Sequence, residues 1–253
     1  METLIFQLQG PLSSWGEVAV GEYRPSADYP SQSAILGLLS AALGIVREDE
    51  DAQMALLSSY RLAVGAINTG RLLRDFHTAQ VPGRADLKKR PQATRRDELA
   101  VPKYDLNTIL STRDYRQDAS AVVALQSHGS RQYTLVQIAE ALLRPKFLLY
   151  LGRKSCPLAV PLYPRIVDAA NVSDAMTGYL QQVAALWSKQ IGNKEAPAIR
   201  LRKIAWGDEF GKDDVASIGR SRDLSVVRKD RVLARNGWQF GDRREHIALL
   251  EEE

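Results

Sequence analysis

The 253 residues are 45% hydrophobic and 25% charged, a composition that excludes a disordered or fibrous chain and predicts a folded globular protein. The single cysteine, Cys156, excludes an intrachain disulfide and favours the reducing cytoplasm as the compartment. The net charge of +4 is mild, and no apolar run reaches the roughly 20 residues of a membrane-spanning helix, so we expect no membrane contact.

The first quarter of the chain predicts a strand, a helix and a hairpin. Residues 3–9 alternate apolar and more polar side chains, as a strand entering a core does. Ser31 or Ser33 is expected to cap a helix whose apolar positions recur every three or four residues, and Gly44 to end it. Residues 61–67 predict a second strand, and the Asn-Thr-Gly turn that follows predicts a hairpin with the next segment.

Residues 77–112 lose this apolar periodicity and are punctuated by prolines. Between Arg71 and Arg116 lie 11 basic and 6 acidic side chains, so the positive charge of the chain is concentrated here. We expect an inserted basic thumb that projects from the domain and orders on a polyanion; a solvated basic loop without a partner would have the same composition. Its cationic residues include Lys88, Lys89, Arg90, Arg95, Arg96 and Lys103.

The middle of the chain adds an apolar strand at residues 119–125 and a helix at residues 135–143, which Pro145 ends. The predicted succession is strand, helix, two strands, insertion, strand, helix and a further apolar segment. This succession is close to the βαββαβ order of ferredoxin-like and RRM folds.

The predicted fold class is therefore α+β, with two domains. A modified ferredoxin-like or RRM domain is expected over residues 1–162, with the thumb inserted at about 77–112. After this the pattern changes to a polar helix at residues 172–190 and shorter alternating segments. Residues 163–253 therefore predict a smaller C-terminal domain.

The sequence gives little support for catalysis or cofactor binding. His77, His128 and His246 lie far apart without metal-site spacing, and the common nucleotide-binding and hydrolase motifs are absent, so we expect no metal and no cofactor. His77, beside Arg74 and Asp75, suits the general base of a metal-free RNA cleavage. A lone histidine at the root of the thumb is more often a simple hydrogen-bond donor.

Two segments combine cations with a backbone suited to phosphate. In Tyr150-Leu151-Gly152-Arg153-Lys154-Ser155, the glycine allows close approach of a phosphate, the two cations pair with it, and the tyrosine ring offers a surface for a base. A glycine turn with a solvated Arg-Lys pair explains this segment equally well. Arg24 precedes a serine-rich helix start, where it either binds a phosphate or pairs with an acid. Trp15 and Cys156 are expected in the core.

Five motifs occur together in a fixed order: GPLSSWG at 10–16, YRPSADYPSQSAILGLLSAALGI at 23–45, RDFHTA at 74–79, TRDYRQDASAVVAL at 112–125 and RPKFLLYLGRKSCPLAVPL at 144–162. In this combination the chain resembles the CasD family of subunits of the type I-E CRISPR Cascade complex. The resemblance covers most of residues 1–162. Residues from about 165 onward match the family pattern poorly, and no function is transferred to them.

The resemblance implies a non-catalytic RNA-binding subunit, with an RRM-like domain and a thumb, that grips the 5′ handle of crRNA and caps the backbone filament of an antiviral complex. The implied partners are the crRNA handle, the backbone subunit CasC and the large subunit CasA, with target DNA reached only through the complex. The implied RNA-binding residues come from the matched motifs and the thumb: Arg24, Arg74, His77, Arg113, Tyr150, Gly152, Arg153, Lys154 and Ser155, with Lys88, Lys89, Arg90, Arg95, Arg96 and Lys103.

Catalysis stays open at this point, because a related subunit of type I-C systems cleaves the crRNA precursor. A metal-independent endoribonuclease is therefore the alternative function. Its candidate groups are His77 with Tyr23 or a nearby lysine.

Overall fold

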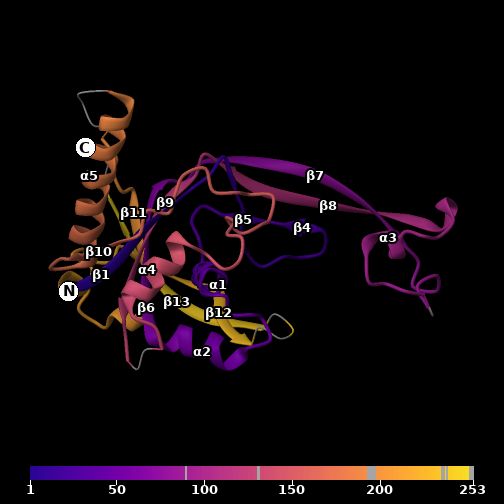
Figure 1. Cartoon of the computed structure of the whole chain (residues 1–253), viewed down its shortest axis with the longest axis horizontal. Coiled ribbons are helices and arrows are strands. Elements are labelled where there is room, and N and C mark those ends of the chain that lie inside the picture. The colour runs from indigo at the N-terminus through magenta and orange to yellow at the C-terminus, as the bar shows by residue number, and fades with distance from the viewer. Residues whose placement is uncertain (89, 130–131, 193–197, 235–236, 238, 251–253) are drawn as a thin grey trace.

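The computed structural model describes residues 1–88, 90–129, 132–192, 198–234, 237 and 239–250. Its centre is a seven-stranded sheet in which every neighbouring pair is antiparallel (Figure 1). The strand order is β10 (Arg165–Asp168), β1 (Glu2–Gln9), β9 (Ser120–Ser127), β6 (Tyr60–Asn68), β11 (Lys203–Gly207), β13 (Gln239–Leu249) and β12 (Leu224–Ala234). The fold is thus mixed α and β with antiparallel sheets, as the predicted α+β class requires.

Helices cover both faces of this sheet, and the side chains of β1 show why. Leu4, Phe6 and Leu8 point into a core shared with α1 (Gln32–Leu43), α2 (Glu50–Ser59) and α4 (Leu135–Leu143). Ile5, between them, points into a second core packed against α5 (Val172–Ile191). Because successive strand residues face opposite sides, one apolar strand serves both cores.

The helix boundaries follow the capping residues that the sequence indicates. Ser31 caps α1 through its side chain, which accepts a hydrogen bond from Ala34 N, and Gly44 ends the helix with φ 80°. Thr134 and Gln137 form a capping box at the start of α4. The predicted helices at 135–143 and 172–190 are confirmed by α4 and α5, and the predicted capping by Ser31 is confirmed as well.

A long hairpin projects from the body (Figure 1). It consists of β7 (Arg71–Pro82) and β8 (Leu106–Gln117), with α3 (Arg95–Glu98) and the 3₁₀ turn η1 (Lys103–Asp105) near its tip. We call residues 71–117 the thumb. At its root, β2 (Leu12–Ser13) and β4 (Tyr23–Arg24) pair with β8 in a second sheet.

The remaining elements are short. β3 (Trp15–Gly16) pairs with β5 (Ser26–Ala27), and η2 (Asp208–Phe210) and α6 (Asp214–Ser217) follow β11. Trp15 and Cys156 are buried, as predicted. In the described part of the chain, no helix combines the length and the apolar character needed to cross a membrane.

Two expectations, one about the strand before the thumb and one about the thumb itself, differ from the structure. The predicted hairpin between residues 61–67 and the next segment is wrong, because β6 pairs with β9 and β11 while β7 pairs with β8. β6 is buried along most of its length and takes an inner position in the main sheet, whereas β7 is largely exposed. The thumb is also more regular than expected, because strand pairing continues out to Pro82 and Leu106.

The C-terminal residues extend the main sheet. β11 pairs with β6, so hydrogen bonds run continuously from the first strands of the chain into β11, β13 and β12. The division into residues 1–162 and 163–253 stays a prediction.

Candidate nucleic-acid interface

The second sheet has two distinct faces at the root of the thumb. Cross-strand partners share a face, and the register pairs His77 with Ser111 and Arg24 with Arg113. Because Ser111 and Arg113 are two residues apart on β8, their side chains point to the same side of the sheet. Arg24, His77 and Arg113 therefore all lie on one side, which we call the basic face. These three residues are 53 and 36 positions apart in the sequence and come together only through β4, β7 and β8.

The polar groups of the basic face are only lightly engaged. Arg24 Nη1 donates to the carbonyl oxygens of Gly21 at 2.6 Å and Tyr23 at 3.1 Å, and the exposed guanidinium has no acidic partner among the described residues. Arg113 Nε donates to Ser111 Oγ at 3.2 Å. His77 Nδ1 lies 3.8 Å from Asp75 Oδ2, with both side chains nearly half exposed. Arg24 and His77 are exposed and Arg113 is partly exposed, so hydrogen-bond donors on this face are available to phosphate oxygens.

Arg153 joins this face from a separate part of the chain. Tyr115 is on the basic face, and the Arg153 guanidinium carbon lies 5.1 Å from the centre of its ring. Arg153 Nη1 also donates to Tyr115 Oη at 3.3 Å. The tyrosine thereby fixes the direction of the cation while leaving its other donors open.

The loop that carries Arg153 is held by the GPLSSWG motif. Gly152 has φ 84°, and a Cβ added there would overlap the carbonyl oxygen of Ser14, so only glycine fits. Ser14 N donates to Leu151 O at 3.0 Å, and Leu151 N donates to Cys156 O at 2.8 Å. Two of the five sequence motifs are therefore joined by backbone contacts. Gly152 is needed at this position because the Ser14 carbonyl leaves no room for a side chain.

The same loop borders a cavity of about 650 Å³. Tyr150 and Gly152 line it on one side, and Gly37 of α1 lines it together with Arg47 and Phe147. Lys154 and Ser155 are exposed beside it. The segment at 150–155 thus places an aromatic ring, an open cavity and two cations next to one another.

Arg74 lies on the opposite face of the sheet from Arg113. Its register partner is Asp114, and Arg74 Nε donates to Asp114 Oδ1 at 2.9 Å. Tyr23 Oη donates to the same carboxylate, and Arg74 Nη2 donates to Tyr23 Oη at 2.9 Å. Arg74 holds the pKa of Asp114 below its usual range, and Asp114 in turn raises the pKa of Tyr23. Of the residues predicted near the thumb root, Arg74 is therefore separate from the other three.

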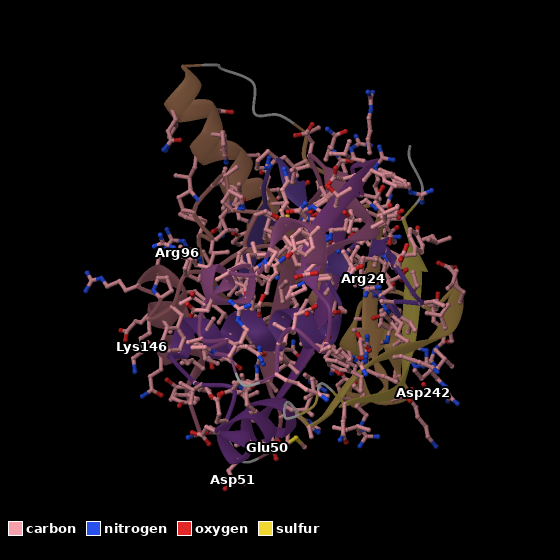
Figure 2. The ribbon with its side chains drawn as sticks, turned by 90° about the vertical axis from the view of Figure 1, so that its right-hand side faces the viewer. Arg24, Glu50, Asp51, Arg96, Lys146 and Asp242 are labelled. Carbon is pink, nitrogen blue, oxygen red and sulfur yellow. The ribbon has the colours of Figure 1, made fainter. Side chains whose placement is uncertain are left out.

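The cations at the thumb tip fall into two groups. Arg95 Nη1 pairs with Glu98 Oε2 at 2.6 Å, and Arg90 donates to the carbonyl oxygen of Ala100. The others that the structure describes are exposed and have no side-chain partner among the described residues: Lys88, Arg96 and Lys103. Lys89 lies outside the described residues. Arg96 belongs to α3 near the tip, and Arg24 belongs to β4 at the root. Figure 2, in which the thumb points toward the viewer, labels the two residues well apart.

The thumb also exposes apolar side chains that the sequence reasoning missed. Phe76 is 71% exposed, Leu72 is 50% exposed, and Tyr104 is 87% exposed. If residues 71–82 had been interpreted as one strand, the exposure of Phe76 and Leu72 could have been predicted. No helix or second sheet in the described part of the chain covers the apolar side chains of this strand.

The geometry disfavours the cleavage alternative in one respect. Tyr23 lies on the Asp114 side of the sheet, whereas His77 lies on the basic face, so the two do not form an acid–base pair. In the part of the chain that the structure describes, no group of three or more His, Cys, Asp or Glu side chains could hold a metal ion.

Comparison with known proteins supplies the family. The family model described as CRISPR-associated protein (Cas_Cas5) matches residues 3–244. The chain is 34% identical over 176 residues to the CRISPR system Cascade subunit CasD of Escherichia coli (strain K12), covering 70% of this chain and 76% of that relative. A chain of a CRISPR RNA-guided surveillance complex matches the fold with a TM-score of 0.64 at 22% identity, over 98% of this chain and 89% of that one. A solved structure described as a Cas protein matches with a TM-score of 0.54 at 23% identity, over 98% and 94%.

Proposed function

Because the chain belongs to the Cas5 family of CRISPR-associated proteins, we propose that it is a Cascade subunit that binds the 5′ handle of crRNA and does not cut it. The observation that carries the proposal is the convergence of Arg24, His77, Arg113 and Arg153 on one face at the root of the thumb. The E. coli relative, named a Cascade subunit, and the surveillance-complex chain with the same fold support the assembly in which this face would act.

In this proposal the RNA backbone follows the basic face and one base enters the adjacent cavity. The guanidinium groups contact phosphates, and Tyr150 at the cavity wall offers a ring for one base. Each neutralised phosphate releases counterions, so affinity for single-stranded RNA falls with salt at a logarithmic slope of about −0.7 per contact. Arg74 acts differently, by holding β7, β8 and β4 together through Asp114 and Tyr23.

We further propose that the first four strands of the main sheet are a ferredoxin-like unit. Their spatial order, β10-β1-β9-β6, with α1 and α4 packed in one core, follows the βαββαβ succession that the sequence predicts. The thumb is then an insertion between the second and third strands of that unit. The basic face therefore lies on the second sheet at the root of the thumb, outside the main sheet.

The exposed apolar side chains of the thumb support a protein partner as well as RNA. A two-stranded ribbon has no core of its own. Leu72 and Phe76 are four residues apart on β7, so their exposed side chains lie on the same face of the ribbon. We propose that the backbone subunit CasC covers this ribbon and that the large subunit CasA contacts the complex nearby, with target DNA reached only through the assembly. The cytoplasm is the proposed compartment.

The first experiment incubates the purified chain with labelled repeat RNA in EDTA and scores retention and cleavage together. The expected result is shifted, intact RNA. Site-specific cleavage that His77→Ala abolishes would instead establish the metal-independent nuclease.

A matched pair of variants tests the site itself. Arg153→Ala is expected to weaken RNA retention about tenfold or more, because a charge-assisted contact is lost. Arg165 is the control, since it also stacks on a tyrosine, 4.2 Å from the ring centre of Tyr163, but lies on β10 at the far edge of the main sheet. Equal effects of Arg153→Ala and Arg165→Ala would show that Arg153 does not contact RNA.

A further inference from the structure

A second pocket lies against α5, on the side of the main sheet opposite α1 and α4. It has a volume of about 500 Å³ and is formed by the first half of α5, residues 199–201, Arg220 and the end of β13. α5 stands at the end of the molecule away from the thumb (Figure 1). The pocket is therefore separate from the basic face.

The apolar side chains that line this pocket are all aliphatic: Leu180, Ile199, Leu201, Leu249 and Leu250. The polar residues of the lining are Ser173, Thr177, Arg200 and Arg220, and no aromatic ring lines the described part of the pocket. Binding of single-stranded nucleic acid relies on aromatic rings for base stacking. An aliphatic lining instead suits an apolar side chain of a peptide.

The polar groups of the pocket are positioned for an anion. Ser173, at the N-terminal turn of α5, is only 5% exposed, and its hydroxyl has no hydrogen-bond partner among the described residues. The guanidinium of Arg220 is exposed and likewise has no partner there. A hydroxyl and a guanidinium that line the same pocket are donors that suit an anion with several acceptor oxygens.

The loop before Arg220 is fixed against the start of α5. Gly219 has φ 84°, and a Cβ added there would overlap the side-chain oxygen of Asn171, the residue that caps α5. Ser173 N donates to Ile218 O at 2.8 Å, and Asp174 N donates to Asn171 Oδ1 at 2.9 Å. Because these backbone donors are already used, an incoming anion would be bound by side chains, with the positive end of the helix dipole adding to the attraction.

We propose that this pocket binds a carboxylate-bearing apolar peptide segment of a partner protein. The carboxylate takes hydrogen bonds from Arg220 and from the hydroxyls of Ser173 and Thr177, and an aliphatic side chain of the same segment rests on Leu249 and Leu201. The observations favour a carboxylate over a nucleotide because the pocket has cations and aliphatic walls but no ring for a base. This surface is independent of the RNA site.

The test measures binding of a fluorescein-labelled ten-residue peptide of alternating leucine and glutamate to the full chain by fluorescence polarisation. Saturable binding is expected, and Arg220→Glu should weaken it about tenfold or more. Arg144→Glu is the matched control, since Arg144 is an exposed arginine at the end of α4 and undergoes the same charge reversal. RNA retention by Arg220→Glu should stay at the wild-type level, so failure here is distinguishable from failure of the RNA proposal.

Ser173→Ala gives a second readout. Because no described residue pairs with the hydroxyl, its removal should leave the melting temperature unchanged, while weakening peptide binding severalfold. A lowered melting temperature with unchanged peptide binding would overturn the proposal and give Ser173 a purely structural role.

Three further outcomes would also overturn it: no saturable binding, displacement of the peptide by adenosine monophosphate but not by acetylglutamate, or binding only after deletion of Glu251 to Glu253. The last result would assign the pocket to the chain's own acidic residues that follow Leu250.

Discussion

The main sheet and the thumb use strands in opposite ways. In β1, Leu4, Ile5 and Phe6 are all fully buried, because helices cover both faces of the sheet. In β7, Phe76 and Leu72 are mostly exposed, although they are as apolar as the residues of β1. The main sheet is stabilised by its own packing, whereas the thumb is fixed at its root by polar contacts and leaves its apolar side chains for partners.

The largest stability effect is expected in the main sheet. Phe6→Ala removes a fully buried ring at the centre of the first core and should lower the free energy of unfolding by about 3–5 kcal/mol. Denaturant unfolding measures this loss. A change below about 1 kcal/mol would show that the core collapses around the site more readily than its packing indicates.

The next largest effect is expected where the body meets the thumb root. Gly152→Ala places a methyl group on the Ser14 carbonyl oxygen in a left-handed conformation, which should cost about 1–3 kcal/mol and displace Arg153 from Tyr115. The control is Gly192→Ala, because Gly192 also has a positive φ, 70°, but has open space around it. Gly152→Ala should lower the melting temperature and RNA retention more than Gly192→Ala does. Equal losses in the two variants would show that the contact with the Ser14 carbonyl does not decide the effect.

A smaller and pH-dependent effect is expected from Asp114. Its pKa is lowered in the folded state, mainly by Arg74, so its contribution to stability is complete above its unfolded pKa of about 3.9 and is lost as the pH falls through the folded value. Asp114→Asn should therefore destabilise the chain near neutral pH and flatten the acid limb of the stability curve. Thermal unfolding between pH 6 and pH 2.5 tests this, and an acid limb identical to that of the wild type would exclude the Asp114 cluster as its source.

The smallest stability effect is expected on the thumb ribbon. Phe76→Ala should change the free energy of unfolding by no more than about 0.5 kcal/mol, because the ring is already exposed. The same variant should weaken assembly with the other Cascade subunits. Assembly at wild-type strength, measured by co-purification of the reconstituted complex, would contradict the proposed role of the ribbon.

The sequence predicted best the features that depend on local chemistry. The capping of α1 by Ser31 and its end at Gly44, and the bounds of α4 and α5, follow from periodicity and capping residues and were confirmed. The wrong hairpin between β6 and the next strand has a physical cause: turn residues show where the chain bends but not which strand becomes its neighbour.

The site was predictable in composition but not in geometry. Motifs identified Arg24, Arg113 and Arg153, and only the strand register brings them to one face. The same register places Arg74 on the other face, although it is three residues from His77 in the sequence. Tyr115, which orients Arg153, carried no signal of its own because its partner lies 38 residues away.

The most direct test of the account compares one arginine from each face. RNA affinity is measured over a range of salt concentrations for Arg113→Gln, from the basic face, and Arg74→Gln, from the Asp114 side. If the RNA follows the basic face, Arg113→Gln should reduce the steepness of the logarithmic salt dependence by about 0.7, the value of one phosphate contact, and Arg74→Gln should leave it unchanged. A reduced slope for Arg74→Gln together with an unchanged slope for Arg113→Gln would place the RNA on the opposite face and contradict the account.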